Sequence, residues 1–482
     1  MERTKNQLDT NGLNMSYIWM ICLVAACGGL LFGYDWVVIG GAKPFYEAYF
    51  AITDPAQSGW AMSSALVGCV LGAAISGWSA DRFGRKKPLI LAAILFTISA
   101  WGTAAASNFD LFVVYRIIGG IGIGLASALS PMYIAEISPA NKRGKFVAIN
   151  QLTIVIGVLA AQLVNLMIAD PVASNATQAD ILATWNGQSG WRWMFGAELV
   201  PALAFLVLMF FVPESPRWLA KDGQYEKASR MLGKIGGDAY AKQTLADIRQ
   251  TLVGETHKVS LAELGKPSVR PILIIGIVLA VFQQWCGINV IFNYAQEIFA
   301  SAGFDINSTL KSIVATGLIN LLFTLIALPM VDKIGRRKLM LIGSAGLTII
   351  YGMMAAAYAT GVLGMPVLLV LAAIAIYALT LAPVTWVLLS EIFPNRVRGL
   401  AMSVGTLALW IACFVLTYTF PLLNAGLGAA GSFLLYGLIC FAGLIFIYRK
   451  VPETKGVTLE ALEAQLAQGK VELTPTKASA SV

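Results

Sequence analysis

The sequence predicts an all-α membrane protein built from two related bundles of six transmembrane helices each. Of its 482 residues, 57% are hydrophobic and only 12% are charged, about half the charged fraction of an ordinary soluble domain. Twelve apolar runs are near the ~20 residues that a helix needs to cross a bilayer. They fall at about 17–41, 59–80, 88–107, 110–133, 146–169, 191–212, 271–300, 310–331, 338–360, 366–390, 400–424 and 429–449.

One set of charged motifs occurs twice, once in each half of the chain. The first copy is DRFGRK at 81–86, then Glu136, Arg143 followed by glycine, and PES at 213–215. The second copy is DKIGRR at 332–337, then Glu391, Arg398 followed by glycine, and PET at 452–454. The repeat predicts two related halves.

The two polar ends and the longest polar stretch between apolar runs divide the chain into five parts. In the longest stretch, apolar residues such as Ala228 and Leu232 recur at three- and four-residue steps, which favours short amphipathic helices. We therefore expect an N-terminal cytoplasmic segment (1–15), an N-terminal bundle (16–212), a linker with amphipathic helices (213–270), a C-terminal bundle (271–450) and a C-terminal cytoplasmic tail (451–482).

The basic residues occupy alternate connections between the apolar runs. By the positive-inside rule these connections and both termini are cytoplasmic, which predicts a multi-pass protein of the plasma (inner) membrane. The net charge of +8 is then an orientation signal and does not indicate nucleic-acid binding. All six cysteines fall inside the apolar runs, where they are expected to pack as small apolar residues.

The repeated charged motifs are expected to form a latch at the cytoplasmic ends of the helices. Arginine and lysine alone could anchor helix ends at the headgroups, but anchoring does not need the carboxylates that accompany them. Carboxylate and guanidinium groups at helix ends can form charge-assisted pairs between neighbouring helices and between halves, which must break when that side opens. The expected latch residues are Asp81, Arg85, Glu136, Arg143, Glu214, Arg217, Asp332, Arg336, Glu391, Arg398 and Glu453.

Several polar residues lie inside the apolar runs, where they are costly unless they line a cavity or pair with each other. An amide is both donor and acceptor, as a sugar hydroxyl is, and aromatic faces such as Phe32 and Trp386 can cover a sugar ring. Bonding between helices is the alternative for any single amide. The adjacent pair Gln283 and Gln284, with Asn289 and a helix-loosening Gly287 close behind, favours a binding site.

Five motifs in order resemble the sugar porter family of the major facilitator superfamily, and the chain is most similar to its bacterial proton-coupled members. They are DRFGRK at 81–86, PESPRWL at 213–219, QQWCGIN at 283–289, EIFP at 391–394 and PETKG at 452–456. The resemblance implies a central sugar site opened alternately to either side. It implies that Gln151, Gln283, Gln284, Asn289, Asn320 and Trp386 hold the sugar hydroxyls, and that Asn293, Tyr294 and Trp410 line the cavity or its gate.

Two positions depart from the members that carry D-xylose. Leu409 precedes Trp410 where those members have a glutamine, and Asn293 with Tyr294 stands where they have a tyrosine pair. The sequence therefore predicts a sugar substrate without identifying the sugar.

Asp35 and Arg116 are charged residues within the first and fourth apolar runs. Burial favours a neutral carboxyl group and a nearby guanidinium favours the ionised one, so a carboxyl group whose surroundings change can carry a proton while arginine stays charged. A static ion pair that only fixes helix packing is the alternative. The resemblance implies symport, because facilitative animal members have a neutral residue at the position of Asp35.

We therefore expect a proton-coupled importer of a monosaccharide, D-xylose or a related pentose or hexose, and no enzyme. A facilitative uniporter and a transporter-like sugar sensor are the alternatives, although a sensor is expected to have a longer cytoplasmic tail. No phosphate-cradling motif of an ATP-driven pump occurs. The expected partners are the sugar, protons and the lipid bilayer, for a monomer with no metal and no cofactor other than the proton as coupling ion.

Overall fold

A computed structural model of the chain describes residues 12–139, 142–173, 176–254, 261–267, 269–362, 364–393 and 397–455. Every regular element among these residues is a helix. The beginning of the expected N-terminal segment and most of the expected tail lie outside the described residues, as do Pro394 and Gly456 of the two last motifs.

The first half of the chain forms the helices α1 to α8. Polar caps begin several of them: Asp54 accepts a hydrogen bond from the backbone of α2, and Asn108 does the same for α4. The elements are α1 (Met15–Tyr49), α2 (Pro55–Phe83), α3 (Lys86–Ala105), α4 (Phe109–Ile137), α5 (Arg143–Ile168), α6 (Gln178–Ala183), the π-helix η2 (Asn186–Gly190), α7 (Trp191–Gly196) and α8 (Leu199–Phe211).

The segment between the halves contains helices, as its apolar spacing predicted. They are α9 (Pro216–Lys221), α10 (Tyr225–Gly254), which is kinked at Gly236 and Gly237, and the 3-10 helix η3 (Leu261–Gly265).

The second half forms α11 to α18. Asp305 caps the start of α14 by accepting a hydrogen bond from Ser308 N. The elements are α11 (Arg270–Trp285), α12 (Ile288–Asn293), α13 (Ala295–Ser301), α14 (Ile306–Ile334), α15 (Arg336–Thr360), α16 (Met365–Leu379), α17 (Leu381–Ile392) and α18 (Arg398–Lys450).

The number of membrane spans in the structure equals the twelve predicted from the sequence, because α18 supplies two of them. Eleven helical stretches among the described residues are long and apolar enough to cross a membrane. The last of them, α18, has 53 residues and a non-helical backbone at Gly428, where φ is +68°. It therefore supplies two spans, and the predicted all-α membrane fold with twelve spans is confirmed.

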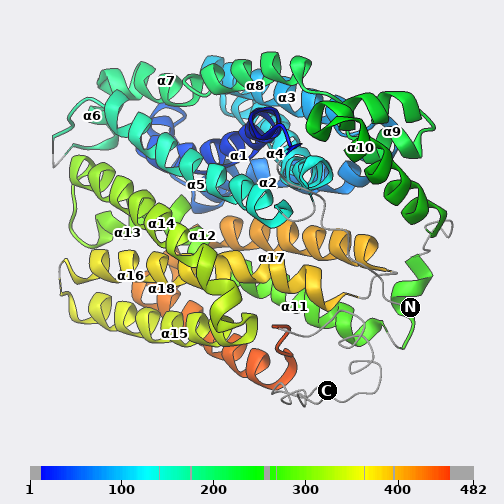
Figure 1. The fold of residues 1–482 in the computed structure, drawn as a ribbon. Helices are drawn as coiled ribbons and strands as arrows, with labels where there is room; N and C mark the ends of the chain where they lie inside the picture. The colour runs from blue at the N-terminus through cyan, green and yellow to red at the C-terminus, as the bar shows by residue number, and fades with distance from the viewer. Residues whose placement is uncertain are drawn as a thin grey trace.

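The two halves lie against each other as two layers of helices (Figure 1). α2 packs against α18 and α5 packs against α14 across the boundary between them. We call the end of the bundles that carries α9, α10 and the repeated charged motifs the basic end. The other end, where α1 finishes and α13 and α14 begin, is called the opposite end.

Two of the predicted spans that carry expected sugar-site residues are interrupted helices. The stretch 271–300 is α11, α12 and α13, broken at Gly287 and Tyr294. The stretch 366–390 is broken at Thr380, where φ is −125° and ψ is −81°. Breaks within membrane spans free backbone groups, which is tolerated where the backbone is buried in protein or lines a water-filled cavity.

Candidate functional site

A buried ion pair joins α1 and α4 within the first half. Arg116 donates through Nη1 to Oδ1 of Asp35, and its Nη2 lies 3.2 Å from the backbone oxygen of the same residue. Asp35 is 0% exposed and Arg116 is 2% exposed. Within the described residues Oδ2 of Asp35 has no hydrogen-bond partner, so the carboxyl group retains an unused acceptor.

Glycine at position 119 makes room for this carboxyl group. A Cβ atom built at Gly119 would lie 2.9 Å from Oδ2 of Asp35 and closer still to Oγ of Ser99. A larger residue would therefore push the helices apart at the ion pair.

Glu198 is a third buried charged group near this pair, and the sequence analysis missed it. It lies between α7 and α8, is 1% exposed, and interacts electrostatically with both Asp35 and Arg116. Its Oε1 has no hydrogen-bond partner among the described residues. The signal that could have found it is an acidic residue within the predicted span 191–212, since acids at that depth are usually functional.

A chain of amides lies at the break in the seventh span. Gln283 Nε2 donates to the Tyr377 hydroxyl at 2.9 Å, and Gln284 Nε2 donates to Gln283 Oε1 at 2.6 Å. Asn289 donates to Oε1 of Gln284. The predicted trio is thus one hydrogen-bonded group, and Tyr377 of α16 is a member that the sequence analysis missed.

The backbone at Gly287 creates this group. Its φ of +84° is left-handed, which favours glycine, and a Cβ there would lie 2.9 Å from the Tyr436 ring. The helix therefore stops after Trp285 and restarts at Ile288, which brings Asn289 back onto Gln284.

Three aromatic rings meet across the boundary between the halves. The ring centroids of Phe32 and Trp410 are 5.8 Å apart, and Trp36 lies 6.0 Å from Phe32 and 5.9 Å from Trp410. Phe32 and Trp36 belong to α1, and Trp410 belongs to α18. Trp36, directly after Asp35 in the chain, was missed because it resembles any apolar residue of a span.

A small cavity is lined by one residue of the ion pair and one of this aromatic group, among others. Its lining includes Arg116, Trp36 and Asn293, and its volume is about 10 Å³, roughly the space of one water molecule. Asn293 is 4% exposed and its Oδ1 has no partner within the described residues. Polar atoms from both halves thus reach the same small space.

The other predicted sugar and cavity residues are more dispersed. Asn320 of α14 is buried, Gln151 of α5 is half-buried, and Trp386 of α17 is 37% exposed. In the described part of the chain no hydrogen bond or ring contact joins these three side chains to the amide group. Tyr294 is fully buried and donates to the Thr417 backbone oxygen at 2.6 Å, so it ties the break in the seventh span to α18.

The repeated motifs form two matching clusters at the basic end, one in each half. In the first, Arg85 Nη2 lies 2.7 Å from Glu136 Oε1, and the Ser215 hydroxyl donates to Glu136 at 2.5 Å. In the second, Arg336 lies 3.0 Å from Glu391, and the Thr454 hydroxyl donates to Glu391 at 2.5 Å. Each of these contacts joins segments of the same half.

Glu214 and Glu453 play the same part in the two clusters. Glu214 accepts hydrogen bonds from the backbone N–H groups of Arg85 at 2.9 Å and Lys86 at 3.1 Å. Glu453 accepts a hydrogen bond from the backbone N–H group of Arg336 at 2.9 Å. Burial raises the pKa of Glu214 above its ordinary value, although the backbone N–H groups act in the opposite direction. Each carboxyl group caps the first turn of a membrane helix.

The remaining latch residues differ in their surroundings. The exposed side chain of Asp81 pairs with Lys221 at 2.9 Å, and Arg398 donates to the Phe393 backbone oxygen at 3.2 Å. Arg143 is exposed, and Arg217 lies in the first turn of α9. The side chain of Asp332 lies outside the described part of the structure.

An ion pair joins the two halves at the opposite end. Lys43 of α1 lies 2.7 Å from Glu47 on its own helix and 2.6 Å from Glu297 of α13. Ser58 of α2 donates to Glu47 at 2.6 Å. Lys43 is 4% exposed, so this contact holds the halves together where α1 ends.

Comparison with known proteins matches the chain to a family of transporters. The profile of the family described as "Sugar (and other) transporter" matches residues 21–466. The chain is 41% identical to the "D-xylose-proton symporter" of Escherichia coli (strain K12), over 94% of this chain and 96% of that protein. It is 37% identical to the "Arabinose-proton symporter" of Bacillus subtilis (strain 168), over 96% and 99%.

A third relative and a solved structure extend the comparison. The "Glucose transport protein" of Synechocystis sp. is 41% identical, over 93% of this chain and 97% of that protein. The partially occluded inward open conformation of the xylose transporter XylE from E. coli superimposes with a TM-score of 0.81 at 38% identity, over 92% of this chain and all of that chain. These matches span nearly the whole chain, which belongs to the sugar transporter family of membrane proteins.

Proposed function

We propose that the chain imports a monosaccharide together with a proton, by alternating access between the two halves. The observation that carries the proposal is the buried group of Asp35, Arg116 and Glu198, beside a site of amides and aromatic rings. Two of the similar proteins are named sugar–proton symporters, which supports both the substrate class and the coupling ion.

Charge balance in the buried group explains why one proton would bind there. Two carboxylates and one guanidinium leave a net charge of −1 in a space from which water is excluded. An uncompensated charge in such a space is costly, so binding one proton makes the group neutral. Oδ2 of Asp35, which has no hydrogen-bond partner within the described part of the chain, would accept this proton.

The sugar site would form between the amide group and the aromatic group. Gln283, Gln284 and Asn289 offer donors and acceptors, and Phe32, Trp386 and Trp410 offer flat apolar faces, which together match a neutral polyol. Gln151 and Asn320 would complete the site from α5 and α14. Trp36, which lies beside Asp35 and touches Trp410, would connect sugar binding to the ion pair.

The basic end would face the cytoplasm, because lysine and arginine gather on cytoplasmic connections. The two clusters of repeated motifs would then act as the cytoplasmic latch, with each cluster stabilising its own half and separating from the other as that side opens. The Lys43 contact at the opposite end would close the protein toward the outside.

Uptake of labelled D-xylose into proteoliposomes tests the proposal. We expect accumulation above the external concentration when an inward proton gradient is imposed, and equilibration alone without it. Equilibration in both conditions would indicate a uniporter, and binding without uptake would indicate a sensor. Competition by a panel of pentoses and hexoses, with the variant Leu409→Gln beside the wild type, would identify the sugar.

A further inference from the structure

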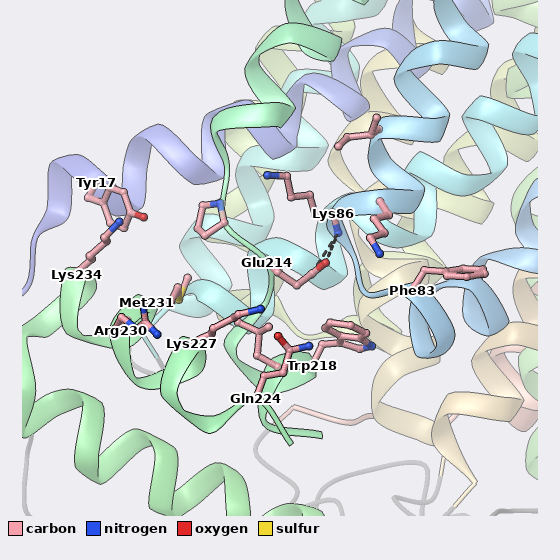
Figure 2. Close-up of a pocket in the computed structure, with 14 residues that line it drawn as sticks. Tyr17, Phe83, Lys86, Glu214, Trp218, Gln224, Lys227, Arg230, Met231 and Lys234 are labelled. Atoms are coloured by element: carbon pink, nitrogen blue, oxygen red, sulfur yellow. Dashed lines mark hydrogen bonds between the residues drawn. The ribbon is translucent and has the colours of Figure 1, made fainter. Parts of the chain in front are cut away.

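A second pocket lies at the basic end, far in the chain from the residues of the sugar site. Its volume is about 710 Å³, and it is lined by the end of α2, the start of α3, the connection after α8, and the helices α9 and α10 (Figure 2). Tyr17 near the start of α1 completes one side. The pocket is thus the space between the first half and the helices that follow it.

The charge of this pocket is strongly positive. Lys86 and Lys87 reach it from α3, and Lys227, Arg230 and Lys234 reach it from successive turns of α10. The one acid in its lining, Glu214, is bonded to backbone N–H groups. Lys87, Lys227 and Lys234 are exposed and form no ion pair with the described residues, so their charges remain available to an anion.

The walls of the pocket are largely apolar. Phe83, Ile90, Trp218, Leu219 and Met231 contribute to its lining. A free anion gains nothing from such walls, whereas an amphiphile can place its apolar part against them. The cations and the apolar walls together match a molecule with a negative headgroup and a hydrocarbon chain.

The position of the pocket agrees with a lipid ligand. Lys86 is the first residue of α3, one of the helices long and apolar enough to cross the membrane. The cations beside it therefore lie at the depth of the lipid headgroups. Basic residues at that depth attract anionic lipids.

We propose that this pocket binds the phosphate group of an anionic phospholipid between the lysines of α3 and the basic residues of α10. The bound headgroup would hold α10 against the end of the first half. The occupant is a structural ligand, separate from the transported sugar and from the proton.

Quenching of Trp218 fluorescence tests this site. The full chain is placed in nanodiscs of phosphatidylcholine that contain brominated phosphatidylglycerol, and the signal of Trp218 is the difference between the wild type and Trp218→Phe. We expect brominated phosphatidylglycerol to quench this signal more than brominated phosphatidylcholine does. The triple variant K227Q/R230Q/K234Q should weaken the lipid-specific quenching about tenfold or more.

The control removes three charges elsewhere on the same face. K242Q/K266Q/K338Q changes exposed lysines that do not line the pocket and should quench as the wild type does. Equal quenching by the two lipids, or unchanged quenching in the triple variant, would overturn the proposal. Displacement of phosphatidylglycerol by millimolar inorganic phosphate at constant ionic strength would assign the site to free phosphate and overturn the lipid assignment.

Discussion

Asp35, Arg116 and Glu198 are charged residues that water does not reach, and their exposed fractions are all 2% or less. Of the three, the sequence predicted Asp35 and Arg116, because a charge in the middle of an apolar run is unusual. Glu198 follows the same rule, but it lies after a run of aromatic residues near the start of its span. Its importance depends on a spatial neighbour, which a single sequence does not display.

The amide group shows which site residues can be predicted from the sequence and which cannot. Gln283, Gln284 and Asn289 are close in the chain and were predicted as a group, and the structure joins them by hydrogen bonds. Tyr377 and Trp36 come from other segments and carry no polar signal that stands out in an apolar run. Contacts across segments need the fold before they can be recognised.

Glu214 gives a prediction for the dependence of stability on pH. Burial raises the pKa of its carboxyl group in the folded protein, so the folded state takes up this proton at a higher pH than the unfolded state does. The folded state therefore gains stability from this group as the pH falls from neutral toward 4.5, the ordinary glutamate value. The variant Glu214→Gln should lack that gain.

The measurement is the thermal unfolding of both proteins in detergent across that pH range. The wild type should become more stable relative to Glu214→Gln as the pH falls. A difference that stays constant, or that moves in the other direction, would show that burial does not dominate the environment of this carboxyl group.

At the scale of elements, the breaks in helices were the hardest feature to predict. The run 271–300 has the length and hydropathy of one long helix, yet the structure divides it at Gly287 and Tyr294. Glycine gave a partial signal at the first break. Thr380 gave none at the break between α16 and α17, because its backbone conformation depends on how the neighbouring helices pack.

The turn between α2 and α3 yields a second prediction. Gly84 has a φ of +85° and lies directly against the carboxyl group of Glu214. Gly84→Ala would force a side chain into that conformation and that space, and should lower the free energy of unfolding by about 1–3 kcal/mol.

Gly144→Ala is the matched control in the same half. Gly144 lies in the first turn of α5, and a Cβ there would meet nothing within 4 Å. This variant should leave stability unchanged or slightly raised, since alanine favours a helix. Thermal unfolding compares both variants with the wild type, and equal losses for the two would contradict the role assigned to the turn.

At the scale of the whole molecule, the closure between the halves lies at the opposite end. Lys43 is buried between Glu47 and Glu297, and removing its charge leaves two carboxylates facing each other. We expect Lys43→Met to raise the ratio of the conformation open at that end to the closed conformation by tenfold or more. This corresponds to a loss of about 1.4 kcal/mol or more of stabilisation of the closed conformation. Lys43→Met with Glu297→Met should restore part of the closure.

Spin labels at the exposed positions Thr53 and Ser301, in a cysteine-free background, would measure this shift as a longer distance between the α1–α2 connection and the end of α13. Lys221→Met is the control, because it breaks the exposed pair with Asp81 at the basic end and should leave the label distance unchanged. A distance in Lys43→Met equal to that of the wild type would exclude the ion pair as a closure.

The repeat in the sequence predicted the symmetry of the molecule and not its specificity. The clusters of Glu136 and Glu391 match contact for contact, as two copies of one motif should. The features proposed to bind sugar and proton are not duplicated. Asp35 and Arg116 belong to the first half, and Gln283, Gln284 and Asn289 belong to the second.

The central claim is that the Asp35 carboxyl group couples sugar movement to the proton. The most direct test compares two assays on Asp35→Asn in proteoliposomes: accumulation of D-xylose driven by a proton gradient, and exchange of labelled sugar between equal pools. We predict that accumulation is lost while exchange remains, because the amide cannot carry the proton but leaves the sugar site intact. Accumulation equal to that of the wild type would contradict the account.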